Sequence, residues 1–168
     1  LGKSFMTFAQ SLDAAARLTE ATLDGILANK SISGEAPEPQ AGRLIAAMRH
    51  AVLGGGKRVR PLLVIESAAL FGVPAEQAAA TGAALELVHC YSLAHDDLPA
   101  MDNDTLRRGR PTVWKAFDEW TAILAGDALL TLAFDVLARE ATHRDPAVRI
   151  ALVRAMARAS GAAGMVGG

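Results

Sequence analysis

The chain has 168 residues and a formal net charge of −1, with 51% hydrophobic and only 5% aromatic residues. This length permits a single domain with a sizeable core. The near-zero net charge provides no broad field for nucleic acid or a membrane surface, so we expect neither as a partner. Alanine and leucine dominate the hydrophobic residues, which favours helices packed on helices over a sheet.

The termini and the cysteine content bear on where the protein works. No apolar run approaches the roughly 20 residues of a membrane span, so we expect no membrane insertion. The chain begins without Met and without a signal-peptide pattern. The single Cys90 excludes an internal disulfide and fits a reducing compartment, for which we expect the cytoplasm. Both ends look cut, so we expect the chain to be part of a longer protein.

Six segments have apolar residues at helical spacing and are predicted helices. In chain order they are residues 5–27, 41–53, 61–71, 74–98, 111–139 and 146–159. The segment 111–139 supports either one long helix or two abutting ones. Residues 31–40 contain two prolines and a glycine and predict a loop. No segment alternates with period two for long enough to predict a strand, so the predicted fold class is all-α.

The most informative segment for function is DDLPAMDND at residues 96–104, which is followed by RRGRP at residues 107–111. Four carboxylates within nine residues repel one another unless a cation lies among them. Oxygen ligands suit Mg²⁺, which keeps some waters and accepts phosphate oxygens, and the arginines favour an anion at the same place. We interpret the segment as a site for a metal ion carrying a phosphate-rich ligand. The alternative is an ordinary solvated acidic turn.

The spacing of the candidate metal ligands Asp96, Asp97 and Asp102 requires a turn. On a regular helix, Asp102 would point about 120° away from Asp96. Pro99 removes one backbone donor and disfavours continuation of the helix, so we expect the chain to bend there. The bend would bring the three carboxylates to one metal cluster.

His89 lies seven residues before Asp96, so the two side chains differ by only about 20° in direction on a helix. Ser92 lies between them on the same face. Taken alone, His89 is more simply interpreted as a satisfied core histidine. We expect His95 to be structural.

A second candidate anion site is GGGKRVRP at residues 54–61. A glycine turn brings the backbone close to a ligand without obstruction by side chains. Lys57 provides a point charge, and the planar groups of Arg58 and Arg60 suit phosphate oxygens. The spacing is not that of a nucleotide P-loop, and a plain surface turn is the alternative. Arg58 alternates away from Arg60, so we expect it to face solvent or a salt bridge.

Together, residues 54–61, HCYSLAHDDLPAMDND at 89–104 and LRRGRPT at 106–112 closely resemble the trans-isoprenyl diphosphate synthases, or polyprenyl synthetases. LAGDALL at 124–130 resembles the segment that follows in the same family. The resemblance implies an all-α isoprenoid synthase helical bundle. Residues 1–168 would form a single domain that is incomplete, corresponding to the N-terminal half to two-thirds of the family fold.

The resemblance also implies head-to-tail condensation of isopentenyl diphosphate with an allylic diphosphate, dimethylallyl or geranyl. Two or three Mg²⁺ ions, held by Asp96, Asp97 and Asp102, would bridge the allylic diphosphate, which Arg107 would also contact. The diphosphate of isopentenyl diphosphate would be held by Lys57, Arg60, His89 and Arg108. The implied catalytic set is Asp96, Asp97, Asp102, Arg107 and Lys57. The family further implies a homodimer.

The family carries a second aspartate-rich motif on a facing helix, and this chain does not contain it. Asp118, Asp127 and Asp135 do not supply the motif, because Asp127 and Asp135 are eight residues apart and neither has a paired aspartate. Asp127 would either face the cavity or cap or decorate a helix surface. We therefore expect the domain to be truncated before the second motif and the fragment alone to be inactive.

Other functions compete with this interpretation. A terpene cyclase also uses aspartate-rich Mg²⁺ sites on a helical fold, but it needs no second diphosphate site such as residues 54–61. A non-catalytic regulatory subunit of a prenyl synthase would be expected to lose metal carboxylates or the arginine pair, which this chain retains. A geranylgeranyl diphosphate synthase differs from a farnesyl diphosphate synthase in product length alone.

Product length depends on what closes the apolar cavity below the aspartates. In the family, bulky residues four or five positions before the first aspartate form this floor, and here those positions are Ser92 and Tyr91. Tyr91 lies about 7.5 Å along the helix from Asp96, and an aromatic residue there resembles bacterial farnesyl diphosphate synthases. Its direction differs from that of Asp96 by about 140°, so geranylgeranyl diphosphate stays the alternative product.

Replacing Tyr91 with alanine should lengthen the product, because the substitution removes the proposed floor of the cavity. The measurement is the chain length of the prenyl diphosphates that the full-length variant and the wild type make from isopentenyl diphosphate, allylic diphosphates and Mg²⁺. An unchanged product spectrum would remove the floor hypothesis.

Overall fold

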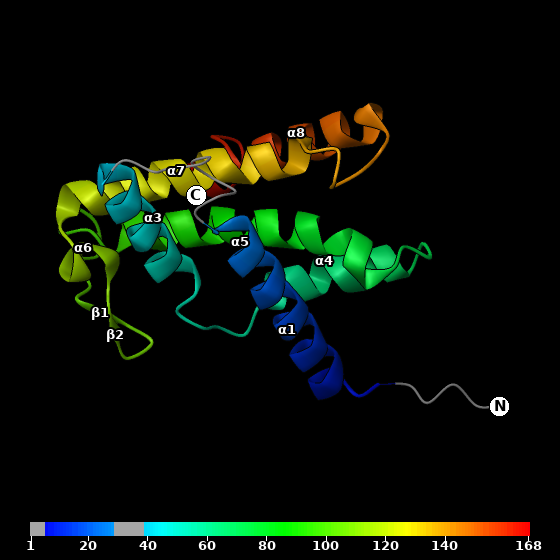
Figure 1. Cartoon of the computed structure of the whole chain (residues 1–168), viewed down its shortest axis with the longest axis horizontal. Coiled ribbons are helices and arrows are strands. Elements are labelled where there is room, and N and C mark those ends of the chain that lie inside the picture. Colours follow the sequence, from blue (N-terminus) through cyan, green and yellow to red (C-terminus); the bar gives the residue numbers. More distant parts are fainter. Residues whose placement is uncertain (1–5, 29–38) are drawn as a thin grey trace.

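A computed structural model describes residues 6–28 and 39–168, and these ranges contain seven α-helices and one β-hairpin. The helices are α1 (Phe8–Ile26), α3 (Pro39–Val52), α4 (Val59–Ala69), α5 (Ala75–Asp96), α6 (Val113–Ala116), α7 (Glu119–Ala138) and α8 (Pro146–Ser160). The hairpin strands are β1 (Leu106–Arg107) and β2 (Arg110–Pro111), and a 3₁₀-helix (Met165–Gly167) follows α8. The helical bundle confirms the predicted fold class (Figure 1). Most of the predicted loop 31–40 lies outside the described residues.

Helix α5 is the centre of the bundle and contacts α1, α3, α4, α7 and α8. Helix α7 lies along α5 in the opposite direction, and the hairpin and α6 lie at the end of the molecule where α5 stops (Figure 1). Ala83, Ala84 and Leu87 of α5 are completely buried, as are Ala125 and Leu129 of α7. Small side chains on both helices let their axes approach closely, which is how an alanine-rich sequence builds a dense core.

The predicted segment 111–139 is two helices, because Asp118 starts a new one. The Asp118 carboxylate accepts a hydrogen bond from the backbone N–H of Thr121 at 2.7 Å and thereby caps α7. Helix α1 begins with a reciprocal cap, in which Thr7 accepts from the backbone of Gln10 and the Gln10 side chain accepts from the backbone of Thr7. Side-chain oxygens at these positions satisfy N–H groups that the first turn of a helix leaves free.

The prediction that the chain forms no strand is wrong at residues 106–111. Leu106 pairs with Pro111 and Arg107 with Arg110, around a two-residue turn. Both turn residues have positive φ, 53° at Arg108 and 76° at Gly109, as a type I′ hairpin turn requires. Two-residue strands are too short to show alternation, and Arg-Gly is not the usual Asn-Gly signal of such a turn. Pro111 consequently lies in a strand and does not start a helix.

The expectation that no apolar segment approaches the length of a membrane span is wrong for α7. It is the one helix in the described part of the chain that is long and apolar enough to cross a membrane, with 20 residues and a mean hydropathy of 1.7 in its most apolar window. Half of that window is buried inside the protein, and α7 packs on α5 and α3. A helix with apolar residues on most sides is also what a protein core requires, and this burial accounts for the composition.

Replacing Leu129 with alanine should lower the free energy of unfolding by about 2–5 kcal/mol, because its side chain is completely buried and leaves a cavity. Leu70→Ala is the matched control, since Leu70 is 84% exposed and its substitution should change stability by less than about 0.5 kcal/mol. Urea unfolding of the full-length variants measures both values. Equal effects at the two positions would contradict the proposed core.

Candidate functional site

The aspartate-rich segment turns back on itself directly after α5. Helix α5 ends at Asp96, and the N–H of Asp102 donates to the carbonyl of Asp96 at 2.8 Å. The N–H of Asn103 donates to the carbonyl of Leu98 at 3.0 Å, with a left-handed φ of 56° at Asn103. The chain therefore makes the turn that Pro99 predicted, and the backbones of Asp96 and Asp102 are in direct contact.

Asp97 has a different partner from the two other aspartates. Its carboxylate is only 3% exposed and accepts three hydrogen bonds from Arg107 of β1, two from Nε at 2.9 and 3.1 Å and one from Nη2 at 2.6 Å. Such fork-to-fork pairs between arginine and a carboxylate are strong and geometrically specific. The ion pair fastens the hairpin to the end of α5 and orients the Arg107 guanidinium. Asp97 is thus committed to an arginine, whereas the sequence placed it in a metal cluster.

The expected cluster of three carboxylates is not assembled. Within residues 6–28 and 39–168, no group of three or more His, Cys, Asp or Glu side chains is placed to hold a metal ion. The carboxylates of Asp96 and Asp102 make no hydrogen bond or salt bridge in these ranges, and their backbones touch. Two free carboxylates from one turn match the donors that Mg²⁺ uses together with waters and phosphate oxygens. The residues present fit Mg²⁺ through Asp96 and Asp102.

The predicted second diphosphate site is a real pocket. It is open, has a volume of about 450 Å³, and lies between the glycine turn and α5. Its lining includes all four residues expected to hold isopentenyl diphosphate, namely Lys57, Arg60, His89 and Arg108. The structure therefore brings together side chains that are up to 51 positions apart in the sequence, from Lys57 to Arg108. The lining also includes Arg58 and Glu86, which pair with each other. The three further cations, Lys57, Arg60 and Arg108, suit an anion.

The environment of His89 is electropositive. Burial and then the charge of Arg60, with smaller effects of Arg108 and Arg107, lower the pKa of His89 below its usual value, and Glu86 only partly opposes them. His89 is therefore a neutral hydrogen-bonding group at neutral pH. A neutral ring is compatible with both sequence interpretations, a core histidine and a residue that binds diphosphate. Because its folded pKa is lowered, the unfolded chain takes up this proton more readily. His89 consequently reduces the free energy of unfolding as the pH falls below about 6.5.

The glycine turn is shaped by the arginines of the hairpin. Arg108 donates from Nη1 to the carbonyl of Gly55. A Cβ atom at Gly56 would fall on the Arg108 guanidinium, and Gly56 has a φ of 143° that side chains rarely adopt. The hairpin and the turn thus close one side of the pocket, and this contact needs a residue without a side chain.

Contacts of His50 also join the hairpin to α3. His50 Nε2 lies 2.8 Å from the carbonyl of Pro111, and Arg110 Nη2 lies 3.4 Å from His50 Nδ1. Since the carbonyl only accepts, the Nε2 of His50 carries the proton and Nδ1 accepts from Arg110. The sequence analysis did not identify His50 as part of the site. The one feature of the sequence that could have indicated it is its position in the last helical turn before the glycines.

The two sequence predictions for Arg58 are settled in favour of a salt bridge. Its side chain is completely buried and pairs with Glu86 of α5 and Glu20 of α1. Glu86 also lines the anion pocket, and the sequence analysis missed it. It lies three residues before His89 on α5, and that spacing alone places both on one face of a helix.

Of the two proposed floor residues on α5, Tyr91 is buried and Ser92 is half-buried. Tyr91 is 8% exposed, and its ring meets that of His95 edge to face at 5.7 Å. His95 Nε2 is 3.0 Å from the carbonyl of Ile123 on α7, and a Cβ at Gly126 would collide with the His95 ring. His95 is therefore structural, as predicted. The Ser92 hydroxyl donates to the carbonyl of its own helix at residue 89, at 2.8 Å.

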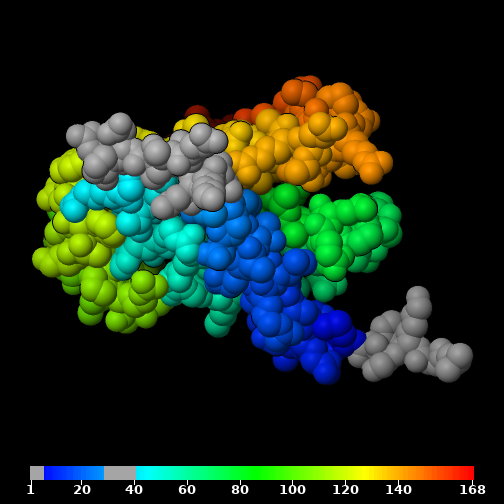
Figure 2. Space-filling model, viewed as in Figure 1, coloured from blue at the N-terminus to red at the C-terminus, as the bar shows by residue number. Residues whose placement is uncertain are grey.

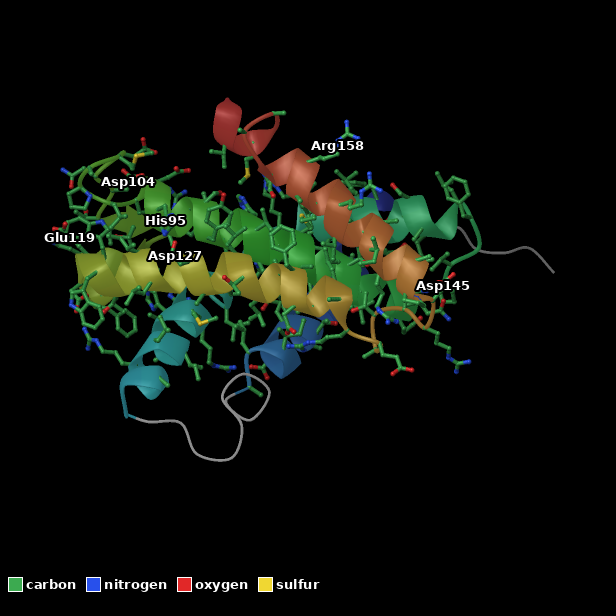
Figure 3. The ribbon with its side chains drawn as sticks, turned by 90° about the horizontal axis from the view of Figure 1, so that it is seen from above. His95, Asp104, Glu119, Asp127, Asp145 and Arg158 are labelled. Atoms are coloured by element: carbon green, nitrogen blue, oxygen red, sulfur yellow. The ribbon has the colours of Figure 1, made fainter. Side chains whose placement is uncertain are left out.

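Asp127 lies beside His95, where α7 passes the C-terminal end of α5 (Figure 3). Its side chain is 62% exposed and 3.9 Å from His95 Nε2. Figure 3 also shows Asp104 at this end of the bundle, with Asp145 at the other. Asp96 ends α5 and Asp102 follows in the turn after it, so both belong to the end of the molecule where Asp104 and the hairpin lie.

Solved structures and relatives with the same fold define the class of protein. The model of the polyprenyl synthetase family matches residues 42–163. The crystal structure of an FPP/GFPP synthase from Zymomonas mobilis superimposes with a TM-score of 0.85 at 50% identity, covering 93% of this chain and 54% of that one. The chain belongs to the polyprenyl synthetase family.

Two relatives show how the chain maps onto longer proteins. Farnesyl diphosphate synthase of Escherichia coli K12 is 45% identical over 97% of this chain and 52% of its own length. The large subunit 1 of a heterodimeric chloroplastic geranylgeranyl pyrophosphate synthase of Arabidopsis thaliana is 46% identical over 84% of this chain and 39% of its own length. The chain thus spans about half the length, or less, of these curated relatives.

Inorganic diphosphate should raise the pKa of His89, because an anion in the pocket stabilises the protonated ring and offsets the repulsion by Arg60 and Arg108. NMR titration of the full-length protein with and without diphosphate measures this pKa. The exposed His143 is an internal control whose ring signals should not shift when diphosphate is added. A His89 pKa that stays constant or falls would contradict an anion site at this pocket.

Proposed function

We propose that the whole protein is a prenyltransferase that condenses isopentenyl diphosphate head-to-tail with dimethylallyl or geranyl diphosphate and yields farnesyl diphosphate. One observation carries the proposal. A pocket is lined by Lys57, Arg60 and Arg108, and the hairpin that carries Arg108 is joined through Arg107 to Asp97, the residue next to Asp96. Two neighbouring anion sites, one made of cations and one made for a metal, fit a reaction between two diphosphates.

The reaction proposed breaks the C–O bond of the allylic diphosphate, and the bonding electron pair leaves with the diphosphate. The allylic cation is attacked by the double bond of isopentenyl diphosphate, which forms the new C–C bond. Loss of a proton then creates the new double bond, and the departing diphosphate is the proposed base. No side-chain base is required for this sequence.

Stabilisation of the leaving diphosphate is the main electrostatic task of the site. Mg²⁺ held by Asp96 and Asp102 would supply charge neutralisation on that leaving group. Arg107 adds a fixed cation beside the same turn, because Asp97 holds its Nε and Nη2 and leaves Nη1 for a ligand. Asp97 is proposed to act through Arg107, and its buried ion pair sets the direction of the guanidinium.

The second substrate is held in the pocket beside α5. Lys57, Arg60 and Arg108 offer charge-assisted donors to its diphosphate, and a neutral His89 offers one more hydrogen bond. Holding both diphosphates in fixed places sets the distance between the allylic carbon and the attacking double bond, which makes the reaction effectively intramolecular.

The farnesyl product rests on Tyr91, which is a bulky residue on the part of α5 that leads away from Asp96. Relatives named farnesyl diphosphate synthase, such as the Escherichia coli protein, support the same product. The Arabidopsis relative, named as a subunit of a heterodimeric geranylgeranyl pyrophosphate synthase, supports geranylgeranyl diphosphate as the alternative.

Full-length protein supplied with Mg²⁺, isopentenyl diphosphate and geranyl diphosphate should release farnesyl diphosphate, and chelation of Mg²⁺ should stop the reaction. Asp96→Asn should lower kcat by about 10²-fold or more, because it removes a metal ligand that acts on the leaving group. Asp135→Asn is the matched control on an exposed pair with Arg139 and should leave kcat unchanged. A cyclised hydrocarbon, or no product, would reject the proposed function.

A further inference from the structure

The buried arginine between the two pocket cations is not explained by substrate contact. Arg58 lies between Lys57 and Arg60 in the sequence, yet its side chain has no solvent exposure. A buried guanidinium costs free energy unless it is fully paired. The role of Arg58 in the segment 54–61 therefore differs from that of an exposed arginine that binds a ligand.

Arg58 joins three elements of the bundle. Its Nη1 donates to Glu86 of α5 at 2.7 Å, and its Nε and Nη2 donate to Glu20 of α1 at 2.8 and 2.5 Å. Nη2 also donates to the carbonyl of Val52 at the end of α3, at 2.6 Å. In Figure 2, α1 lies at the front of the bundle, and it packs on α4 and α5. Within the network, the Arg58 side chain has no solvent exposure and that of Glu20 is 38% exposed.

The backbone of Arg58 is also unusual. It adopts a left-handed conformation with a φ of 49° and lies immediately before the first residue of α4. Residues with a side chain avoid this conformation unless the surroundings impose it. Four hydrogen bonds to its guanidinium impose it here, and the resulting turn sends Lys57 and Arg60 to the same pocket.

Glu86 places a carboxylate in the lining of the anion pocket. It is 3% exposed and lines the anion pocket beside His89. A carboxylate at this place would repel a diphosphate or pair with its cations. Arg58 holds the Glu86 oxygen at 2.7 Å and so compensates this charge.

We propose that Arg58 is a positioning residue for the isopentenyl diphosphate site, which fixes the direction of Lys57 and Arg60 and keeps Glu86 from competing with the bound anion. The inference rests on the proposed function for the identity of the ligand. It deepens that proposal by adding a residue that lines the pocket while its guanidinium donates to Glu86, Glu20 and the Val52 carbonyl.

The test uses Arg58→Lys in the full-length protein. Lysine keeps the charge, but one ammonium group does not replace a planar fork that binds three partners at once. The KM for isopentenyl diphosphate should rise roughly tenfold, as is typical when a residue that orients other ligands is removed, and the KM for geranyl diphosphate should change less than about twofold. Arg139→Lys, which alters an exposed pair with Asp135, is the matched control and should change neither KM.

The double variant R58M/E86Q tests the role of Glu86. If Arg58 acts partly by holding this carboxylate, removal of its charge should restore part of the affinity that R58M loses. Affinity for inorganic diphosphate, measured by calorimetry, reports this without any turnover.

Equal rises of both KM values in Arg58→Lys, or wild-type values for both, would overturn the positioning role.

The calorimetric arm also separates this inference from the proposed function. A wild type that makes no prenyl diphosphate but binds inorganic diphosphate more tightly than Arg58→Lys rejects the function and supports the positioning role. A wild type that makes farnesyl diphosphate while Arg58→Lys binds inorganic diphosphate equally well rejects the positioning role alone.

Discussion

The packing of α7 along α5 is the contact on which the rest of the structure depends. Alanines and a glycine at this contact, such as Ala83, Ala125 and Gly126, let the two helices approach closely. The end of α5 is thereby held rigidly, and every candidate functional group lies on this helix, follows it in the chain, or faces it from the glycine turn. A precise electrostatic site on a helix end requires such a rigid support.

The charges of the site are arranged so that each is either paired or directed at a ligand. Asp97 is paired with Arg107, and Glu86 with Arg58, in two ion pairs whose carboxylates are buried. The groups without such partners, Asp96 and Asp102 on one side and Lys57 on the other, project from the turns on either side. In a low-dielectric setting, an unpaired charge is costly to bury, which explains why the charges without ion-pair partners are the ones that stay accessible.

The hairpin connects these parts although it has only two residues in each strand. Its arginines hold the end of α5 through Asp97, the glycine turn through the Gly55 carbonyl and α3 through His50. Arg107 and Arg108, two residues predicted to bind ligands, lie in this hairpin. The same side chains therefore hold the hairpin in place and belong to the predicted binding site. A diphosphate that bound there would compete with contacts that hold the hairpin in place.

The sequence by itself determined the helical fold and the break after α5 that Pro99 predicts, and its resemblance to the polyprenyl synthetases grouped Lys57, Arg60, His89 and Arg108. The fold and the break follow from local signals, namely helical periodicity and a residue that disfavours the helix, whereas the grouping follows from family motifs. Only the tertiary structure decided that Asp97 pairs with Arg107, that Arg58 is buried with Glu86, and that residues 106–111 form a hairpin. Those outcomes depend on which side chains meet across separate elements, and periodicity along the chain carries no information about such meetings.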